Sequence, residues 1–292
     1  MRDHKRKLRL LTLAAIAVLA AGALIARWKT PAERAAVPIL QKNAEARGGL
    51  AAWRKVRTLT MEGTLDAGTP RDPAKQAAAY LQAWRQTKAE ARRRAIEGAG
   101  GGEKPVQLPF VMELERPRKS RVELTFRGER AVQVYDGSSG WKLRPFLGRR
   151  EVEPFTAEEA RVAAQQADLD GPLIDADRKG SRVELLGTEP VEGRDAYKLH
   201  VTLPSGDVRN VWVDAQTFLE VRIDGSRRMD GKPRPVFTYF RDYRAVDGLV
   251  IPHELETAVE GVRGSEKIRI EHVAVNPPLD ESRFGRPDAA GA

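Results

Sequence analysis

Residues 106–126 read VQLPFVMELERPRKSRVELTF and contain two stretches in which apolar and polar side chains alternate. Apolar side chains occupy every second position over 108–114 and again over 122–126. An alternation with a period of two places these side chains on one face of a β-strand. The step from Arg116 to Pro117 restricts the chain between the two stretches to an extended or turn conformation. The sequence therefore predicts an antiparallel hairpin with one apolar face.

Similar alternation continues to residue 275, and turn-forming pairs such as Glu192-Gly193 and Asp247-Gly248 separate the stretches. This spacing predicts an antiparallel sheet of about ten strands. Helical signals occur at Pro38–Arg47 and at a capping box that begins at Thr156, from which a helix is expected to run to about Ala167. The predicted fold class is α+β, with one strongly curved antiparallel sheet and helices against one face. Residues 30–292 are expected to form a single domain.

The N-terminal residues differ in character from the rest of the chain. Residues 1–29 carry a net charge of +6 out of the total of +9, and the run Leu10–Ala26 is apolar and uncharged. This pattern predicts a signal peptide or a retained N-terminal membrane anchor, and both place the domain outside the cytoplasm. The remaining charge of +3 is too small for the basic face of a typical nucleic-acid binder, so no nucleic-acid partner is expected.

Residues 71–105 interrupt the strand pattern after the first strand. This segment is rich in Ala, Gln, Lys and Arg, contains eight basic and four acidic residues, and ends in a glycine tract. It predicts a helical basic insertion between the first two strands. Two interpretations remain open: a solvated, loosely docked helix, or a basic arm that contacts anionic lipid or a partner.

The sequence contains no motif of a known catalytic or metal site. Zero cysteines exclude disulfides and thiol chemistry, and the motifs of P-loop, dinucleotide-binding, serine hydrolase and zinc protease sites are absent. We therefore expect no catalytic residue, no metal and no cofactor, and do not expect an enzyme.

Six phrases of the sequence resemble the LolA/LolB outer-membrane lipoprotein-sorting family in their order along the chain. They are NAEARGGLAAW (43–53), LERPRKSRVEL (114–124), YDGSSGW (135–141), VEGRDAYKL (191–199), VDAQTFL (213–219) and DYRAVDGLVIP (242–252). Together they extend the resemblance over about residues 37–287.

The resemblance implies an unclosed β-barrel with helices as a lid over an apolar cavity that holds acyl chains. It implies that Arg116 bonds to the lid and keeps the empty cavity shut. The alternative is that Arg116 only precedes Pro117 in an extended turn. The implied partners are an acyl lipid or lipoprotein cargo and a membrane surface or membrane-bound donor and acceptor proteins. The implied location is the periplasm, where the protein is a monomer, soluble or tethered to the inner membrane by its N-terminal helix.

Bulky side chains on the alternating strands are candidates for the cavity lining, and two more are expected from the lid. These residues are Met61, Phe110, Met112, Leu124, Phe126, Trp141 and Leu143, with Leu173 and Ile174 from the lid. The same alternation also produces an ordinary packed core, so both interpretations stay open.

Two functions are consistent with these observations. The first is an exported lipid or lipoprotein carrier or chaperone that takes part in lipoprotein or lipid sorting to the outer membrane. The second is an RseB-like periplasmic sensor or interaction module that binds a membrane-protein partner. Copurifying acyl lipid favours the carrier, and a stable protein partner favours the sensor.

Overall fold

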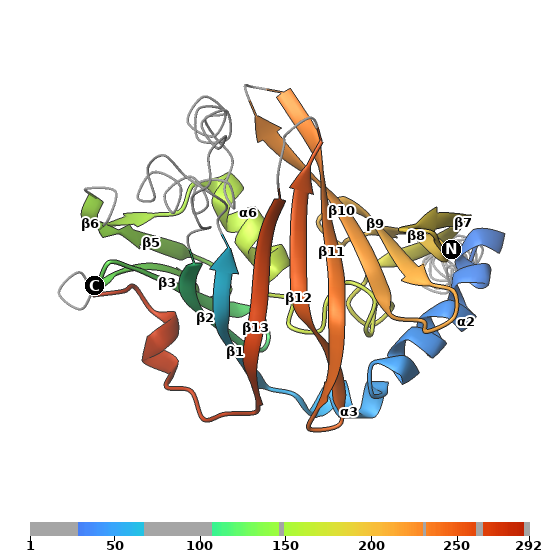
Figure 1. The fold of residues 1–292 in the computed structure, drawn as a ribbon, viewed down its shortest axis with the longest axis horizontal. Coiled ribbons are helices and arrows are strands. Elements are labelled where there is room, and N and C mark those ends of the chain that lie inside the picture. The colour runs from blue at the N-terminus through green and yellow to red at the C-terminus, as the bar shows by residue number, and fades with distance from the viewer. Residues whose placement is uncertain (1–28, 67–106, 146–148, 230–231, 261–264, 289–292) are drawn as a thin grey trace, which may run out of the picture.

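The computed structural model describes residues 29–66, 107–145, 149–229, 232–260 and 265–288 (Figure 1). Over these ranges, thirteen strands form one curved antiparallel sheet whose two edge strands do not pair with each other. The strands are β1 (Thr58–Asp66), β2 (Gln107–Glu115), β3 (Lys119–Phe126), β4 (Glu129–Tyr135), β5 (Gly140–Arg144), β6 (Arg149–Pro154), β7 (Arg182–Val191), β8 (Arg194–Thr202), β9 (Val208–Asp214), β10 (Glu220–Met229), β11 (Lys232–Val246), β12 (Leu249–Val259) and β13 (Ser265–Val275). The helices are α2 (Pro31–Ala46), α3 (Leu50–Lys55), α6 (Ala157–Gln166) and the short 3₁₀ helix η2 (Glu281–Phe284). The predicted fold class is confirmed.

Tight turns connect most neighbouring strands. In the β7–β8 and β11–β12 turns, the φ angles are 49° at Glu192, 80° at Gly193, 48° at Asp247 and 80° at Gly248. Positive φ at both central residues matches the twist of a two-residue hairpin, which explains the Gly at each second position. The expectation of about ten strands was too low. The sequence gives no strand signal for β6, because this edge strand, RREVEP, is largely exposed and has almost no apolar alternation.

The first helix begins seven residues before the predicted start at Pro38, at Pro31. The Thr30 hydroxyl accepts a hydrogen bond from the Glu33 backbone N–H at 3.1 Å, and the Glu33 carboxylate accepts one from Thr30 N–H at 2.6 Å. This capping box fixes the start of α2. Pro38 then lies inside the helix, on its exposed side, where water can reach the carbonyl that lacks a donor.

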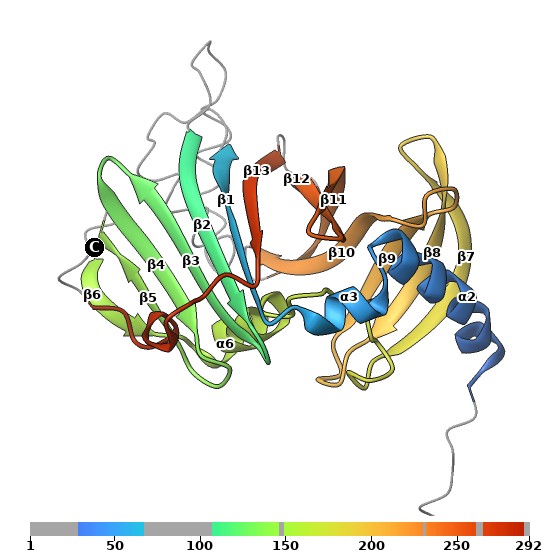
Figure 2. The same ribbon diagram turned by 90° about the horizontal axis from the view of Figure 1, so that it is seen from below.

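The connection between β6 and β7 determines where the helices lie. These two strands are consecutive in the chain but occupy opposite edges of the sheet. Residues 155–181, which include α6 and are called the crossover segment here, therefore pass across the concave face (Figure 2). The helices α2 and α3 continue this layer toward the β7 edge. We call α2, α3 and the crossover segment together the helical layer.

Apolar contacts hold the helical layer on the sheet. Ala36 and Ile39 of α2 pack with Val183 and Leu199 of β7 and β8. Trp53 of α3 is 1% exposed and lies in a second cluster near the middle of the sheet. The core is thus a series of adjoining clusters between the two layers.

Two predicted segments fall outside the described residues. Of the expected leader 1–29, only Lys29 is described, and the expected insertion 71–105 lies wholly outside, between β1 and β2 in chain order. In the part of the chain that is described, no helix is long and apolar enough to cross a membrane.

Candidate functional site

The concave face of β1–β3 carries five of the predicted lining residues. Met61 lies opposite Met112, and Phe110 lies opposite Leu124, so these pairs share one face of the sheet. With Phe126 they belong to one apolar cluster. Phe110, Leu124 and Phe126 are at most 8% exposed, whereas Met61 and Met112 are only half-buried. The two thioethers therefore form the accessible part of this face.

The crossover segment contributes the two residues predicted for the lid. Leu173 is 3% exposed and packs against α2 and the β7–β9 region. Ile174 is 0% exposed and packs beside Trp53 and Leu114 near the centre of the sheet. Both residues thus join the helical layer to the concave face, but they contact different clusters.

Trp141 and Leu143 do not join this group. They lie opposite Val134 and Val132 and pack with Phe284 of η2 on the other face of β5. Because side chains alternate along a strand, Lys142 between them faces the helical layer instead. The C-terminal segment covers the face that carries Trp141 and Leu143, so both faces of β5 are buried and apolar character alone does not identify the concave one.

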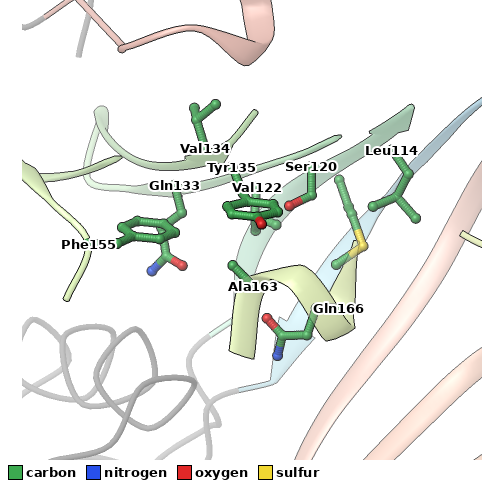
Figure 3. Close-up of a pocket in the computed structure, with 10 residues that line it drawn as sticks. Leu114, Ser120, Val122, Gln133, Val134, Tyr135, Phe155, Ala163 and Gln166 are labelled. Carbon is green, nitrogen blue, oxygen red and sulfur yellow. The ribbon is translucent and has the colours of Figure 1, made fainter. Parts of the chain in front are cut away.

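A small pocket lies between α6 and strands β2–β4 (Figure 3). Its interior volume is about 20 Å³, which is close to the space that one water molecule needs. The residues that line it are Met112, Leu114, Ser120, Val122, Gln133, Val134, Tyr135, Phe155, Ala163 and Gln166. The resemblance led us to expect space for acyl chains, and this pocket is much smaller, because the side chains of α6 pack directly on the sheet.

Arg116, at the end of β2, bonds to the helical layer. Its Nη1 and Nη2 donate to Asp170 Oδ1 and Oδ2 at 3.1 and 2.8 Å. Its Nε and Nη2 also donate to the carbonyl oxygens of Val56 and Trp53, at the end of α3, at 2.6 and 3.0 Å. The Asp170 side chain is 2% exposed and that of Arg116 is 31% exposed. One guanidinium therefore ties the sheet to both α3 and the crossover segment.

Two more cations surround Asp170. Arg47 Nη1 donates to the Asp170 carbonyl oxygen at 3.1 Å and to Glu220 Oε1 of β10 at 3.0 Å. Lys179 Nζ lies 3.5 Å from Asp170 Oδ1 and donates to Asp168 Oδ1 at 2.7 Å. Burial raises the pKa of Asp168, although the neighbouring Lys179 opposes this shift. The crossover segment is thus held by a largely buried polar network as well as by apolar packing.

A more exposed ion pair also joins α3 to the crossover segment. Arg54 Nε and Nη2 donate to Asp175 Oδ2 and Oδ1 at 2.7 and 2.6 Å. These hydrogen bonds lower the pKa of the Asp175 carboxyl. A second ion pair fixes the first turn of α6, where Glu159 accepts from Lys142 Nζ at 2.7 Å.

Several residues of this site were not predicted from the sequence. Gln133 is a polar residue at an inward position in AVQVY (131–135), and that position is its only signal. Asp170 resembles an ordinary turn former in DLDGPLID (168–175). Their partners come from distant strands, which the sequence does not place. Among the described residues, no group of three or more His, Asp or Glu is arranged to hold a metal ion.

Comparisons with known proteins identify the fold. No family model matches the chain, and no curated protein matches its sequence. A DUF1329 family protein from Desulfovibrio piger superposes with a TM-score of 0.54 at 13% identity, covering 87% of this chain and 98% of that protein. A LolA superfamily protein from Nitrosomonas europaea superposes with a TM-score of 0.51 at 12% identity, covering 85% of this chain and 96% of that protein. The resemblance predicted from the sequence is confirmed at the level of the fold: the chain has the fold of LolA superfamily proteins.

Proposed function

We propose that this protein is an exported carrier or chaperone that holds the acyl chains of a lipid or lipoprotein between its sheet and its helical layer. The observation that carries the proposal is the combination of an apolar concave face with a cover that polar bonds keep in place. Met61 and Met112 give this face flexible side chains, which can adapt to acyl chains of different shape. The LolA-like fold supports the same function.

The size of the hydrophobic effect explains why such a protein needs a cover. Exposing one sixteen-carbon chain to water costs about 12 kcal/mol, at about 0.8 kcal/mol for each CH₂ group. A carrier has to offset most of this cost and still release its cargo. A sheet face alone exposes apolar surface to water when empty, and the helical layer prevents that exposure.

Binding then requires the helical layer to move. The pocket under α6, of about 20 Å³, does not hold an acyl chain, so we propose that the helical layer is closed on the sheet at this place and opens there to admit one. When the layer opens, water takes the place of the protein groups that accept hydrogen bonds from Arg116. The acyl chain takes the place of the α6 side chains that pack on the sheet. Arg116 is therefore proposed as the latch, and Met61, Phe110, Met112, Leu124 and Phe126 as the surface that receives the chain.

The leader supports a location outside the cytoplasm, and we place the protein in the periplasm. There it exchanges cargo with a membrane surface or with membrane-bound donor and acceptor proteins.

Native mass spectrometry on protein purified without detergent tests this proposal. We expect masses with bound acyl lipid, which solvent extraction then identifies. A ligand-free mass in every preparation would contradict the carrier. Recovery of a stable membrane-protein partner without lipid would instead support the sensor module.

A further inference from the structure

One row of side chains crosses the concave face perpendicular to the strands. The pairs Met61–Met112, Met112–Val122, Val122–Gln133 and Gln133–Lys142 lie opposite each other on β1 to β5. Opposed residues in an antiparallel sheet share a face. Along this row the chemistry changes from thioether and alkyl groups to an amide and then to an ammonium group. Gln133 marks the boundary between the apolar and the charged part.

The Gln133 amide is buried without a complete set of hydrogen bonds. The residue is 5% exposed, and its Nε2 has no hydrogen-bond acceptor among the described residues. Its side chain lines the pocket, and the amide extends toward α6 beside Phe155 and Ala163 (Figure 3). A buried donor without a partner is unfavourable and is rare in folded proteins. The arrangement leaves room for an acceptor from outside the protein.

The neighbouring charges indicate which acceptor fits. Lys142, the next residue in the row, donates to both carboxylate oxygens of Glu159 at 2.7 and 2.8 Å and lies 3.8 Å from Glu153. Arg144 is 2.6 Å from the same Glu153. Both cations already have carboxylate partners, so a ligand anion gains little from them and would still lose its hydration at this buried place. A neutral carbonyl oxygen meets neither obstacle.

We propose that the Gln133 amide donates a hydrogen bond to the carbonyl oxygen that links an acyl chain to its headgroup by an ester or amide bond. The hydrocarbon then lies along Val122, Met112 and Met61, toward the centre of the sheet. This inference rests on the proposed function and adds the chemical feature of the cargo that is recognised. The hydrogen bond also fixes where the acyl chain ends in the site, because the next residue of the row beyond Gln133 is the charged Lys142.

Two lipids that differ in one oxygen atom test the inference. A 1-O-hexadecanoyl glycerol carries the carbonyl oxygen, and 1-O-hexadecyl glycerol, its ether, does not. The affinity of the full chain for each is measured by displacement of a fluorescent fatty-acyl probe. We expect the wild-type protein to prefer the ester about 3- to 10-fold, as one added neutral hydrogen bond predicts.

The variant Gln133→Leu is expected to lose this preference and to keep the affinity for the ether. Its ligand-free form should unfold at the same or a higher temperature than the wild type, because the unpaired donor is gone. The control Val122→Ala shortens the neighbouring apolar side chain of the same row without changing its polarity, and should weaken the binding of both lipids to a similar extent.

Equal affinities of the wild type for ester and ether would overturn the inference and leave the carrier function standing. A preference that persists in Gln133→Leu would also overturn it. If neither lipid nor the probe binds the wild type, the proposed function fails and the inference fails with it. The wild-type preference is measured without any variant, so the test stands even if Gln133→Leu does not fold.

Discussion

Arg116 is the residue at which the sheet, α3 and the crossover segment meet. Its four hydrogen bonds reach one carboxylate and two backbone carbonyls. The carboxylate of Asp170 is almost fully buried, and charge-assisted hydrogen bonds to such a group are the stronger ones. The planar guanidinium meets both oxygens at once, a geometry that a lysine does not offer.

Replacement of Arg116 tests the strength of this link. Arg116→Leu leaves the buried Asp170 with fewer partners, and we expect it to lower the free energy of unfolding by about 2–3 kcal/mol. Arg116→Lys should recover only part of the loss. The measurement is urea unfolding followed by circular dichroism. The control Arg118→Leu removes a cation from the same turn without touching these hydrogen bonds, and an equal effect of both leucine variants would contradict the assignment.

Gly48 and Gly49 form a matched pair at the junction of α2 and α3. Both have positive φ, 102° and 91°. A Cβ at Gly48 would collide with the carbonyl oxygen of Gly248 in the β11–β12 turn, whereas a Cβ at Gly49 meets no atom within 4 Å.

We therefore expect Gly49→Ala to cost about 1–3 kcal/mol through backbone strain alone. Gly48→Ala should cost more, because the turn beneath it also has to move. Thermal unfolding of the two variants checks the order. A Gly49→Ala protein that is less stable than Gly48→Ala would show that the close approach to the turn is unimportant.

The sequence places some residues of the site on the correct face of the sheet and others on the wrong one. Alternation correctly groups Met61 with Met112, since both lie in long strands with one apolar face. It fails at Trp141, because β5 is apolar on the face under η2 and carries Lys142 on the concave face. The carboxylate to which Lys142 donates, that of Glu159, comes from α6, and no local pattern in the sequence indicates such a contact.

At the scale of elements, α3 and the crossover segment are joined by the pair Arg54–Asp175. The hydrogen bonds from Arg54 lower the pKa of Asp175 below the ordinary Asp value of about 3.9. A lowered carboxyl pKa means that the charged form favours the folded state. This contribution is complete above the ordinary value and is lost as the pH falls through the lowered pKa.

Asp175→Asn removes the charge and keeps the local backbone, because Asn also tolerates the φ of 53° at this position. We expect the variant to be less stable than the wild type at pH 7, and the difference in Tm to vanish when the pH falls well below 3.9, where both side chains are neutral. Differential scanning calorimetry across this range is the measurement. A Tm difference independent of pH would contradict the ion-pair account.

The limits of the helices and strands are predicted best where a local signal exists. The capping box at Thr156 correctly marks the start of α6, which ends at Gln166, one residue before the expected Ala167. The pair Thr30-Pro31 also resembles a helix start, and the predicted helix nevertheless began at Pro38, while β6 gives almost no apolar signal. Strand order is predictable for successive hairpins. The separation of β6 and β7 by the whole width of the sheet depends on long-range pairing of β1 with β13.

At the scale of the whole molecule, this topology separates a continuous sheet from the helical layer that packs on it. The sheet is continuous from β6 to β7, and its backbone hydrogen bonds do not depend on the helical layer. The helical layer adheres through side-chain clusters and the network around Asp170. In the proposed function, opening would move the helical layer and leave the sheet intact.

The central claim is that the concave face receives acyl chains, and two neighbouring residues of β2 test it. Met112 is half-buried on the concave face, and Val111, also half-buried, lies on the opposite face between Glu62 and Glu123. Binding of a fluorescent fatty-acyl probe is measured for the wild type, Met112→Arg and Val111→Arg, with folding checked by circular dichroism. We predict that the wild type and Val111→Arg bind the probe and that folded Met112→Arg binds at least 10-fold more weakly, equivalent to about 1.4 kcal/mol. Undiminished binding by folded Met112→Arg would contradict the account.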